Sequence, residues 1–168
     1  MARANHAPWK PKSFRSIKAL NAELDTIEDA HNAGRLSTTG NWTVGQCLEH
    51  CTIIMRSSFD GFEARAPLPV RIVGALFFKP MLSRPNAQMK PGLKLPKKAS
   101  SVLPHDTVSV EEGLALMREQ LARIESGEKM GLPSPVMGKM THEQWVLFHL
   151  NHCRMHFGFF QYGTDSHA

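Results

Sequence analysis

A chain of 168 residues, 42% of them hydrophobic, is long enough to bury a core, and we expect a single domain over residues 1–168. Three cysteines in apolar segments argue against a disulfide scaffold and favour a reducing cytoplasm, and no apolar run reaches the roughly 20 residues that span a bilayer. The net charge of +5 originates in one segment, because residues 65–98 hold eight Lys or Arg and no acid. Such a segment is more typical of a solvated surface than of nucleic-acid binding.

The N-terminal residues 1–13 carry charges and two prolines but no apolar stretch. This composition is unlike a signal peptide and predicts a mobile arm. The first helix is expected over residues 16–33, with Gly34 as its C-cap. Its hydrophobic positions recur three and four residues apart, at Ile17, Leu20, Leu24 and Ile27.

Three further helices are expected to begin at a capping box, in which two side chains three residues apart satisfy each other's backbone donors. The boxes are Thr43/Gln46, Ser109/Glu112 and Thr141/Gln144, and the helices that follow are expected over residues 43–64, 110–126 and 142–162. With almost no strand pattern in the chain, these elements predict an all-α protein. The expected architecture is an antiparallel four-helix bundle with a long crossover between its second and third helices.

The crossover, residues 65–107, is a proline-rich basic connector. Because a structureless loop of this length is uncommon, we expect residues 71–82 to form a short helix that Pro80 stops. Four apolar side chains of this helix need cover, so it should pack across one end of the bundle: Ile72, Ala75, Leu76 and Phe78.

Histidines gather on one face of the last expected helix. His149, His152 and His156 fall within about 60° of one another at ~100° per residue. The pair His152 and His156, four residues apart, is a recurring way for a helix to offer two nitrogen ligands to one ion. A third ligand must come from another element, and His50, near the middle of the second expected helix, is the natural candidate.

Such a site fits a divalent transition metal, zinc or nickel first, because neutral imidazole is a borderline ligand. Three protein ligands leave a position open, where the metal lowers the pKa of bound water or thiol and generates a nucleophile. No catalytic acid or base is evident from the pattern. Gln46, Glu49 and His149 are candidates for orienting a ligand or handling a proton beside the site.

Two alternatives involve the same region. Cys47 and Cys51 flank His50, and Cys153 follows His152, which raises a mixed Cys/His site. Adjacent residues on a helix point about 100° apart, however, so we expect these cysteines to be buried and inert. In the second alternative the histidines are hydrogen-bonding core residues of a non-catalytic module, whose apolar face drives dimerisation or partner binding.

The metalloprotease pattern of two histidines around a glutamate is absent. Glu143 follows His142, but no second histidine stands at the distance that a zinc-binding helix of this kind requires. Protease chemistry of that type is therefore set aside.

Two stretches resemble a known family. Residues 41–50 (NWTVGQCLEH) resemble the second-helix signature of the DinB-like superfamily, and residues 140–145 (MTHEQW) with the histidines after them resemble the last-helix signature of an uncharacterised bacterial branch of it. The resemblance implies a four-helix bundle, often dimeric. It also implies a metal site formed by His50, His152 and His156.

In related groups the metal activates a low-molecular-weight thiol, as in mycothiol-dependent isomerases and bacillithiol transferases. The resemblance thus implies a metal-dependent transferase or hydrolase that acts on a small molecule through a metal-bound thiol or water. The basic residues 65–98 would then be a dock for an anionic cofactor. One departure is the stretch 157–160 (FGFF), where relatives often carry a Gln shortly after the final histidine, so the pocket is expected to be drier.

Overall fold

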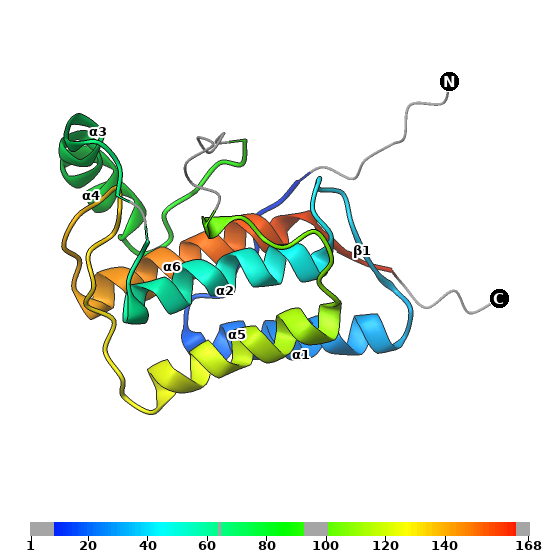
Figure 1. Ribbon diagram of the computed structural model, residues 1–168. Helices are drawn as coiled ribbons and strands as arrows, with labels where there is room; N and C mark the ends of the chain where they lie inside the picture. Colours follow the sequence, from blue (N-terminus) through cyan, green and yellow to red (C-terminus); the bar gives the residue numbers. More distant parts are fainter. Residues whose placement is uncertain (1–8, 64, 93–100, 164–168) are drawn as a thin grey trace, which may run out of the picture.

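The computed structural model describes residues 9–63, 65–92 and 101–163 (Figure 1). In this part of the chain the protein is mostly helical, in agreement with the expected all-α class. The long helices are α1 (Ile17–Asn32), α2 (Val44–Asp60), α5 (Val110–Glu125) and α6 (His142–His156). The short elements are β1 (Leu36–Thr38), α3 (Leu68–Val73), η1 (Gly74–Phe78), α4 (Lys79–Leu82), η3 (Phe157–Phe159) and β2 (Phe160–Tyr162).

All four long helices begin at a residue whose hydroxyl accepts a backbone N–H. Ser16 caps α1 by accepting from the backbone nitrogen of Ala19 at 3.1 Å. The three expected capping boxes are confirmed, with both hydrogen bonds present in each: Thr43/Gln46, Ser109/Glu112 and Thr141/Gln144. These caps satisfy donors that would otherwise be orphaned at the helix starts, and they fix where α2 and α6 begin.

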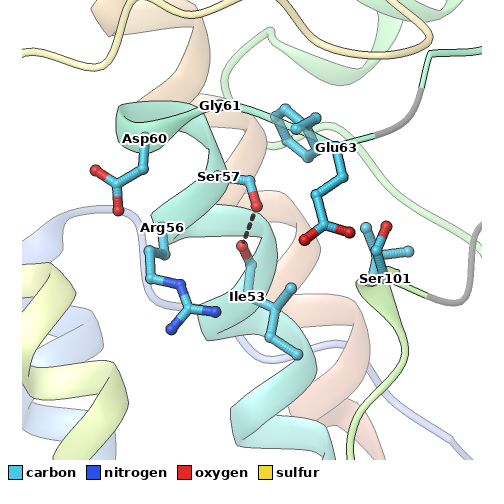
Figure 2. A pocket seen from close by; sticks show the side chains of 9 residues that line it. Ile53, Arg56, Ser57, Asp60, Gly61, Glu63 and Ser101 are labelled. Carbon is cyan, nitrogen blue, oxygen red and sulfur yellow. Dashed lines mark hydrogen bonds between the residues drawn. The ribbon is translucent and has the colours of Figure 1, made fainter.

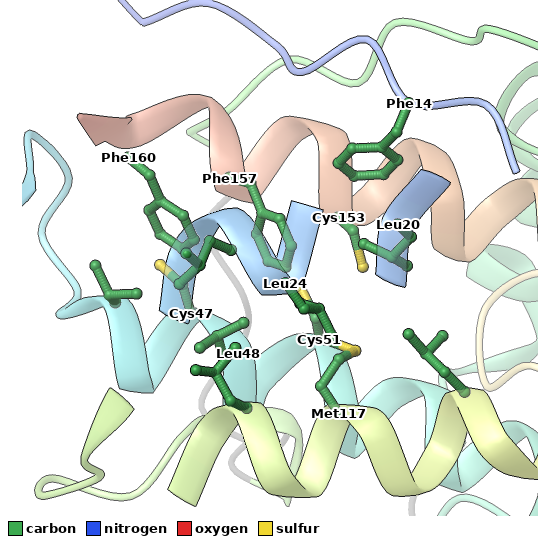
Figure 3. Close-up of a cluster of buried hydrophobic side chains, with 14 of the residues drawn as sticks. Phe14, Leu20, Leu24, Cys47, Leu48, Cys51, Met117, Cys153, Phe157 and Phe160 are labelled. Atoms are coloured by element: carbon green, nitrogen blue, oxygen red, sulfur yellow. The ribbon is translucent and has the colours of Figure 1, made fainter. Parts of the chain in front are cut away.

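The four long helices lie side by side, with α5 and α6 each in contact with both α1 and α2. Their facing sides meet in one main core, where Leu24 of α1, Leu48 of α2 and Met117 of α5 are fully buried (Figure 3). Each such side chain contributes about 1.5–3 kcal/mol when it leaves water. This core holds α2 against α6, which are the two helices that carry the candidate ligands.

The end of α6 differs from the expectation of a helix to Tyr162. The α-helix ends at His156, η3 follows, and β2 pairs antiparallel with β1, with Leu36 opposite Tyr162. Within the described residues the named strands are these two three-residue segments, which leaves the chain in the expected all-α class. In η3, the backbone of Lys10 approaches Gly158 too closely for any side chain. The aromatic residues after it suit a strand edge.

The connector also departs from expectation. Its helical part begins at Leu68 and continues through Pro80 to Leu82, so Pro80 does not stop it. The π-helical turn η1 precedes the proline, with the backbone N–H of Lys79 donating to the oxygen of Gly74, five residues earlier. This wider turn accommodates a residue that lacks an N–H and clashes with a regular helix.

The expected burial of the connector's apolar side chains is wrong. Ile72, Leu76 and Phe78 are exposed, and only Ala75 of the four expected residues is half-buried. Contacts with α6 and with the loop before it hold the segment at one end of the long helices, leaving its outer face open.

Residues 9–13 of the expected N-terminal arm lie along the end of α6. The indole of Trp9 donates to the oxygen of Met155 at 2.9 Å, and the backbone nitrogen of Lys12 donates to the oxygen of Arg154 at 3.0 Å. This part of the arm is therefore held in place, whereas residues 1–8 lie outside the described residues. Within the described ranges, no helix has the length and apolar character needed to cross a membrane.

Replacing Gly45 by alanine should destabilise the protein, although alanine is ordinarily the better helix former. A Cβ at this position would meet the backbone oxygens of Val108 and Ser109, which cannot move without displacing the start of α5. We expect a loss of about 1–3 kcal/mol in the free energy of unfolding, measured by urea denaturation.

Gly131→Ala is the matched control, because a Cβ there meets nothing within 4 Å. Its stability should stay within about 1 kcal/mol of the parent protein. Equal stabilities for the two variants would contradict the close approach of α2 to the connector.

Candidate metal centre

The packing of α2 on α6 brings together the three histidines that the sequence singled out. One ring nitrogen from each of His50, His152 and His156 lies within 4.8 Å of the other two. The ring centroids are 5.1 Å apart for His50 and His152, 4.8 Å for His50 and His156, and 4.6 Å for His152 and His156. Three imidazoles from two helices therefore surround one point at a spacing suited to a single metal ion.

The orientation of His50 is set by the connector. Its Nδ1 lies 2.6 Å from the backbone oxygen of Val102. Because a carbonyl oxygen only accepts, Nδ1 must carry the proton, and Nε2 keeps its lone pair. This contact is the arrangement usual for a metal-ligating histidine, whose second ring nitrogen donates to a carbonyl or carboxylate.

His152 and His156 face each other through their Nε2 atoms, which are 3.1 Å apart. Two nitrogens bound to one tetrahedral zinc would lie about 3.3 Å apart, given Zn–N distances near 2.0–2.1 Å. The observed separation is close to that value. The sequence spacing of four residues thus aims both rings at one point, as expected for a helix that offers two ligands.

Aromatic side chains wall the three imidazoles. Trp42, two residues before the start of α2, stacks on His156 with ring centroids 5.6 Å apart and lies 4.8 Å from the ring of His50. Phe148 stacks on His152 at 5.6 Å. These flat contacts restrict ring rotation and replace water around the nitrogens, so the imidazoles are held in position by packing.

Burial keeps the three imidazoles neutral near pH 7. The pKa of His156 is lowered to about 3, first by burial and then by the charge of His50. Burial also lowers the pKa of His50 and, together with its histidine neighbours, lowers that of His152 far below the ordinary range. Neutral imidazole is the form that binds metal, so no proton has to be displaced at neutral pH.

His149 lies on the same helix but makes different contacts. Its Nε2 is 3.1 Å from the hydroxyl of Ser58, and its ring stacks on Trp145 at 5.2 Å. It is fully buried, and its Nδ1 has no hydrogen-bond partner among the described residues. The geometry therefore does not bring His149 into the cluster formed by His50, His152 and His156.

Gln46 and Glu49 contact the connector. The Gln46 amide donates to the backbone oxygens of His105 and Asp106 at 3.1 and 3.2 Å. The Glu49 carboxylate accepts from the backbone nitrogen of His105 at 2.7 Å and lies 2.6 Å from its ring. Both residues therefore act on the histidine cluster indirectly, because they hold the stretch of connector that follows Val102.

The three cysteines lie in the core (Figure 3), as expected. Burial raises the pKa of Cys47 to about 12. Burial and contact with Cys153 raise that of Cys51 well above its usual range. Cys47 and Cys51 are thus held as thiols, whereas metal binding requires the thiolate.

A pocket of about 220 Å³ lies beside the C-terminal half of α2, lined in part by Arg56, Asp60, Glu63 and Val102 (Figure 2). It is not lined by any of the three clustered histidines. Arg123 pairs with Asp60 at 2.7 Å and holds its pKa below the ordinary value. The pocket therefore borders the connector residue that orients His50 without opening onto the imidazoles.

Trp42 and Val102 contact the site, but sequence reasoning gave them no role. Trp42 stands in the stretch that resembles the DinB-like signature, and its place just before a capping box is a signal that could have identified it. Val102 contributes only a backbone oxygen, for which side-chain patterns hold no signal.

The sequence model of the family described as "Protein of unknown function (DUF1569)" matches residues 10–162. Comparison with curated proteins and with solved structures gives no match. The matched range includes all of the histidine cluster and both helices that carry it.

Metal-free protein should lose stability as the pH falls from about 6.5 to 5, a window in which carboxylates change little. The pKa of His149 is lowered to about 3 by burial, so the unfolded chain binds a proton there that the folded chain does not. Stability therefore rises with pH across this window, and His149 alone accounts for about 2 kcal/mol between pH 6.5 and 5.

Urea denaturation at both pH values measures this loss. The variant His149→Gln should show a shallower dependence because it removes one titrating group. Unchanged or greater stability at pH 5 in the parent protein would show that these histidines are not buried in the neutral form.

Proposed function

The chain belongs to the DUF1569 family, and we propose that His50, His152 and His156 bind one divalent transition-metal ion between α2 and α6. The observation that carries the proposal is the convergence of three neutral ring nitrogens within 4.8 Å. The hydrogen bond between His50 Nδ1 and Val102 leaves the Nε2 lone pair of His50 available to a metal. A histidine that only stabilises a core ordinarily hydrogen-bonds to backbone or water, whereas the Nε2 atoms of His152 and His156 face each other.

Zinc or nickel suits the donor set. Three imidazoles without a carboxylate or thiolate form a borderline nitrogen site, and a three-ligand site leaves a fourth coordination position open. When bound, the metal would lower the pKa of a water or thiol in that position. Trp42 and Phe148 would exclude bulk water from two sides of the ion, and Val102 would keep His50 in the tautomer that ligates through Nε2.

The reaction we propose is a metal-dependent transfer or hydrolysis on a small molecule, through a metal-bound thiol or water. Support comes from the resemblance of residues 41–50 and 140–145 to DinB-like signatures. In related groups the metal activates a low-molecular-weight thiol. In this proposal α1, α2, α5 and α6 form an antiparallel DinB-like bundle, and the protein is a bacterial, cytoplasmic homodimer of single-domain chains. Gln46, Glu49 and His149 support the site from outside the ligand set.

A second candidate function is a non-catalytic module in which the histidines are structural. It is favoured by the small exposed fractions of His50 and His152, 3% and 7%, and by a pocket whose lining, drawn in Figure 2, includes none of the three histidines. In this alternative no small molecule reaches a metal. The two candidates differ in whether an ion binds and whether its fourth position accepts an added ligand.

Metal content tests the first requirement. Protein purified without a polyhistidine tag should contain about one equivalent of metal per chain by elemental analysis, or bind one by calorimetric titration with Zn²⁺ or Ni²⁺. His50→Ala and His152→Ala should each weaken binding more than ~100-fold, since loss of even an outer hydrogen-bond partner costs 10–100-fold.

His31→Ala is the matched control, because this half-exposed histidine pairs with Glu111 away from the cluster. It should retain parent affinity. A parent protein that folds normally, contains no metal and shows no binding heat would eliminate the proposal.

Access to the fourth position is a separate prediction. Adding 2-mercaptoethanol to Co²⁺-loaded protein should produce a thiolate-to-cobalt charge-transfer band in the near ultraviolet, because a three-ligand site has room for one thiolate. The His31→Ala control should give the same band, and His156→Ala should not. An unchanged spectrum in a protein that has bound cobalt would favour the non-catalytic alternative.

A further inference from the structure

The helical part of the connector exposes several large apolar side chains. Six side chains of α3, η1 and α4 form what we term the apolar ridge: Leu68, Ile72, Leu76, Phe77, Phe78 and Met81. Leu76 and Phe77 are each 64% exposed. Isolated exposed apolar residues are ordinary, but a contiguous set of this kind marks a surface that contacts another molecule.

The ridge is held firmly on its inner side. The amide of Asn151 on α6 donates to the backbone oxygens of Leu82 and Arg84 at 2.9 and 3.0 Å. Lys79 donates through Nζ to the oxygen of Lys139 at 3.2 Å, and Gly74 is buried against Val136. These contacts fix which face points outward, so the exposure of the ridge is a property of the fold. In Figure 1, α3 and α4 project beyond one end of the long helices.

The charged residues next to the apolar ridge in the sequence are all basic. Residues 65–92 include Arg65, Arg84 and Lys90, all exposed, and no acid. The loop on which the segment packs, residues 129–140, adds Lys129 and Lys139 and also lacks acids. Glu143 on α6 interacts electrostatically with Lys129, but residues 65–92 themselves combine apolar side chains with basic ones and no acid. A segment of this kind is complementary to a surface that is apolar inside and anionic outside.

We propose that the apolar ridge inserts into the surface of an anionic lipid membrane, with the flanking Arg and Lys side chains at the level of the lipid phosphates. A lipid interface supplies both an apolar layer for Leu76 and Phe77 and negative charge for Arg65, Arg84 and Lys90. A second copy of the chain fits less well. A two-fold contact between ridges would bring the same basic segments together, with no acid in them to pair with.

Vesicle co-sedimentation tests the proposal on the full chain. The protein should bind vesicles of phosphatidylcholine mixed with phosphatidylglycerol and should bind pure phosphatidylcholine much more weakly. Leu76→Ser/Phe77→Ser should abolish binding. Arg65→Gln/Arg84→Gln should reduce the partition coefficient on anionic vesicles roughly fivefold per charge removed, as expected for basic residues near an anionic surface.

The matched control is Leu103→Ser, which removes an exposed leucine outside both the ridge and the loop of residues 129–140 and should leave binding unchanged. All variants should keep the circular dichroism of the parent protein. The proposal fails if the parent protein does not bind anionic vesicles, or if the control variant loses as much binding as the ridge variant. It also fails if the parent protein does not bind vesicles and sedimentation shows that it is a dimer, which only the substitutions of the ridge variant dissociate.

Discussion

The hydrogen bond from His50 Nδ1 to the oxygen of Val102 is the contact on which the candidate site depends. It sets the tautomer of His50 and aims Nε2 toward α6. It is supported by two neighbours on α2, since Gln46 and Glu49 bind the connector at His105 and Asp106. One helix face therefore both supplies a ligand and holds the segment that orients it. Capping by Thr43 fixes where α2 begins.

Burial of the histidines has opposing consequences. It lowers their pKa values and makes neutral ligands at neutral pH, but it leaves His152 Nδ1 without a hydrogen-bond partner among the described residues. An unsatisfied buried polar atom costs about 1–3 kcal/mol. Packing in the core, together with the stacking of Phe148 on His152, offsets this cost in the folded chain. A bound ion would add stability to a cluster that is unfavourable without one.

Local signals in the sequence predicted the helix starts and the three clustered histidines. Capping boxes act within three residues, and the spacing of His152 and His156 follows from one helical turn. Signals that depend on distant backbone were missed. Val102 contributes an oxygen that every residue has, the strand after η3 depends on pairing with β1, and the helix passes Pro80 because η1 widens the turn before it. The expected burial of Leu76 is wrong because hydrophobic periodicity indicates a helix but does not indicate which element covers its apolar side chains.

X-ray absorption spectroscopy of the zinc-loaded protein tests the central claim most directly, because it reports the atoms bound to the ion. We expect three imidazole nitrogens at about 2.0–2.1 Å and a fourth light ligand, with no sulfur in the first coordination sphere. The His50→Ala variant should show one imidazole fewer or no ordered site. A sulfur shell near ~2.3 Å, or a hydrated ion with no imidazole scattering, would contradict the convergence of His50, His152 and His156 on one metal.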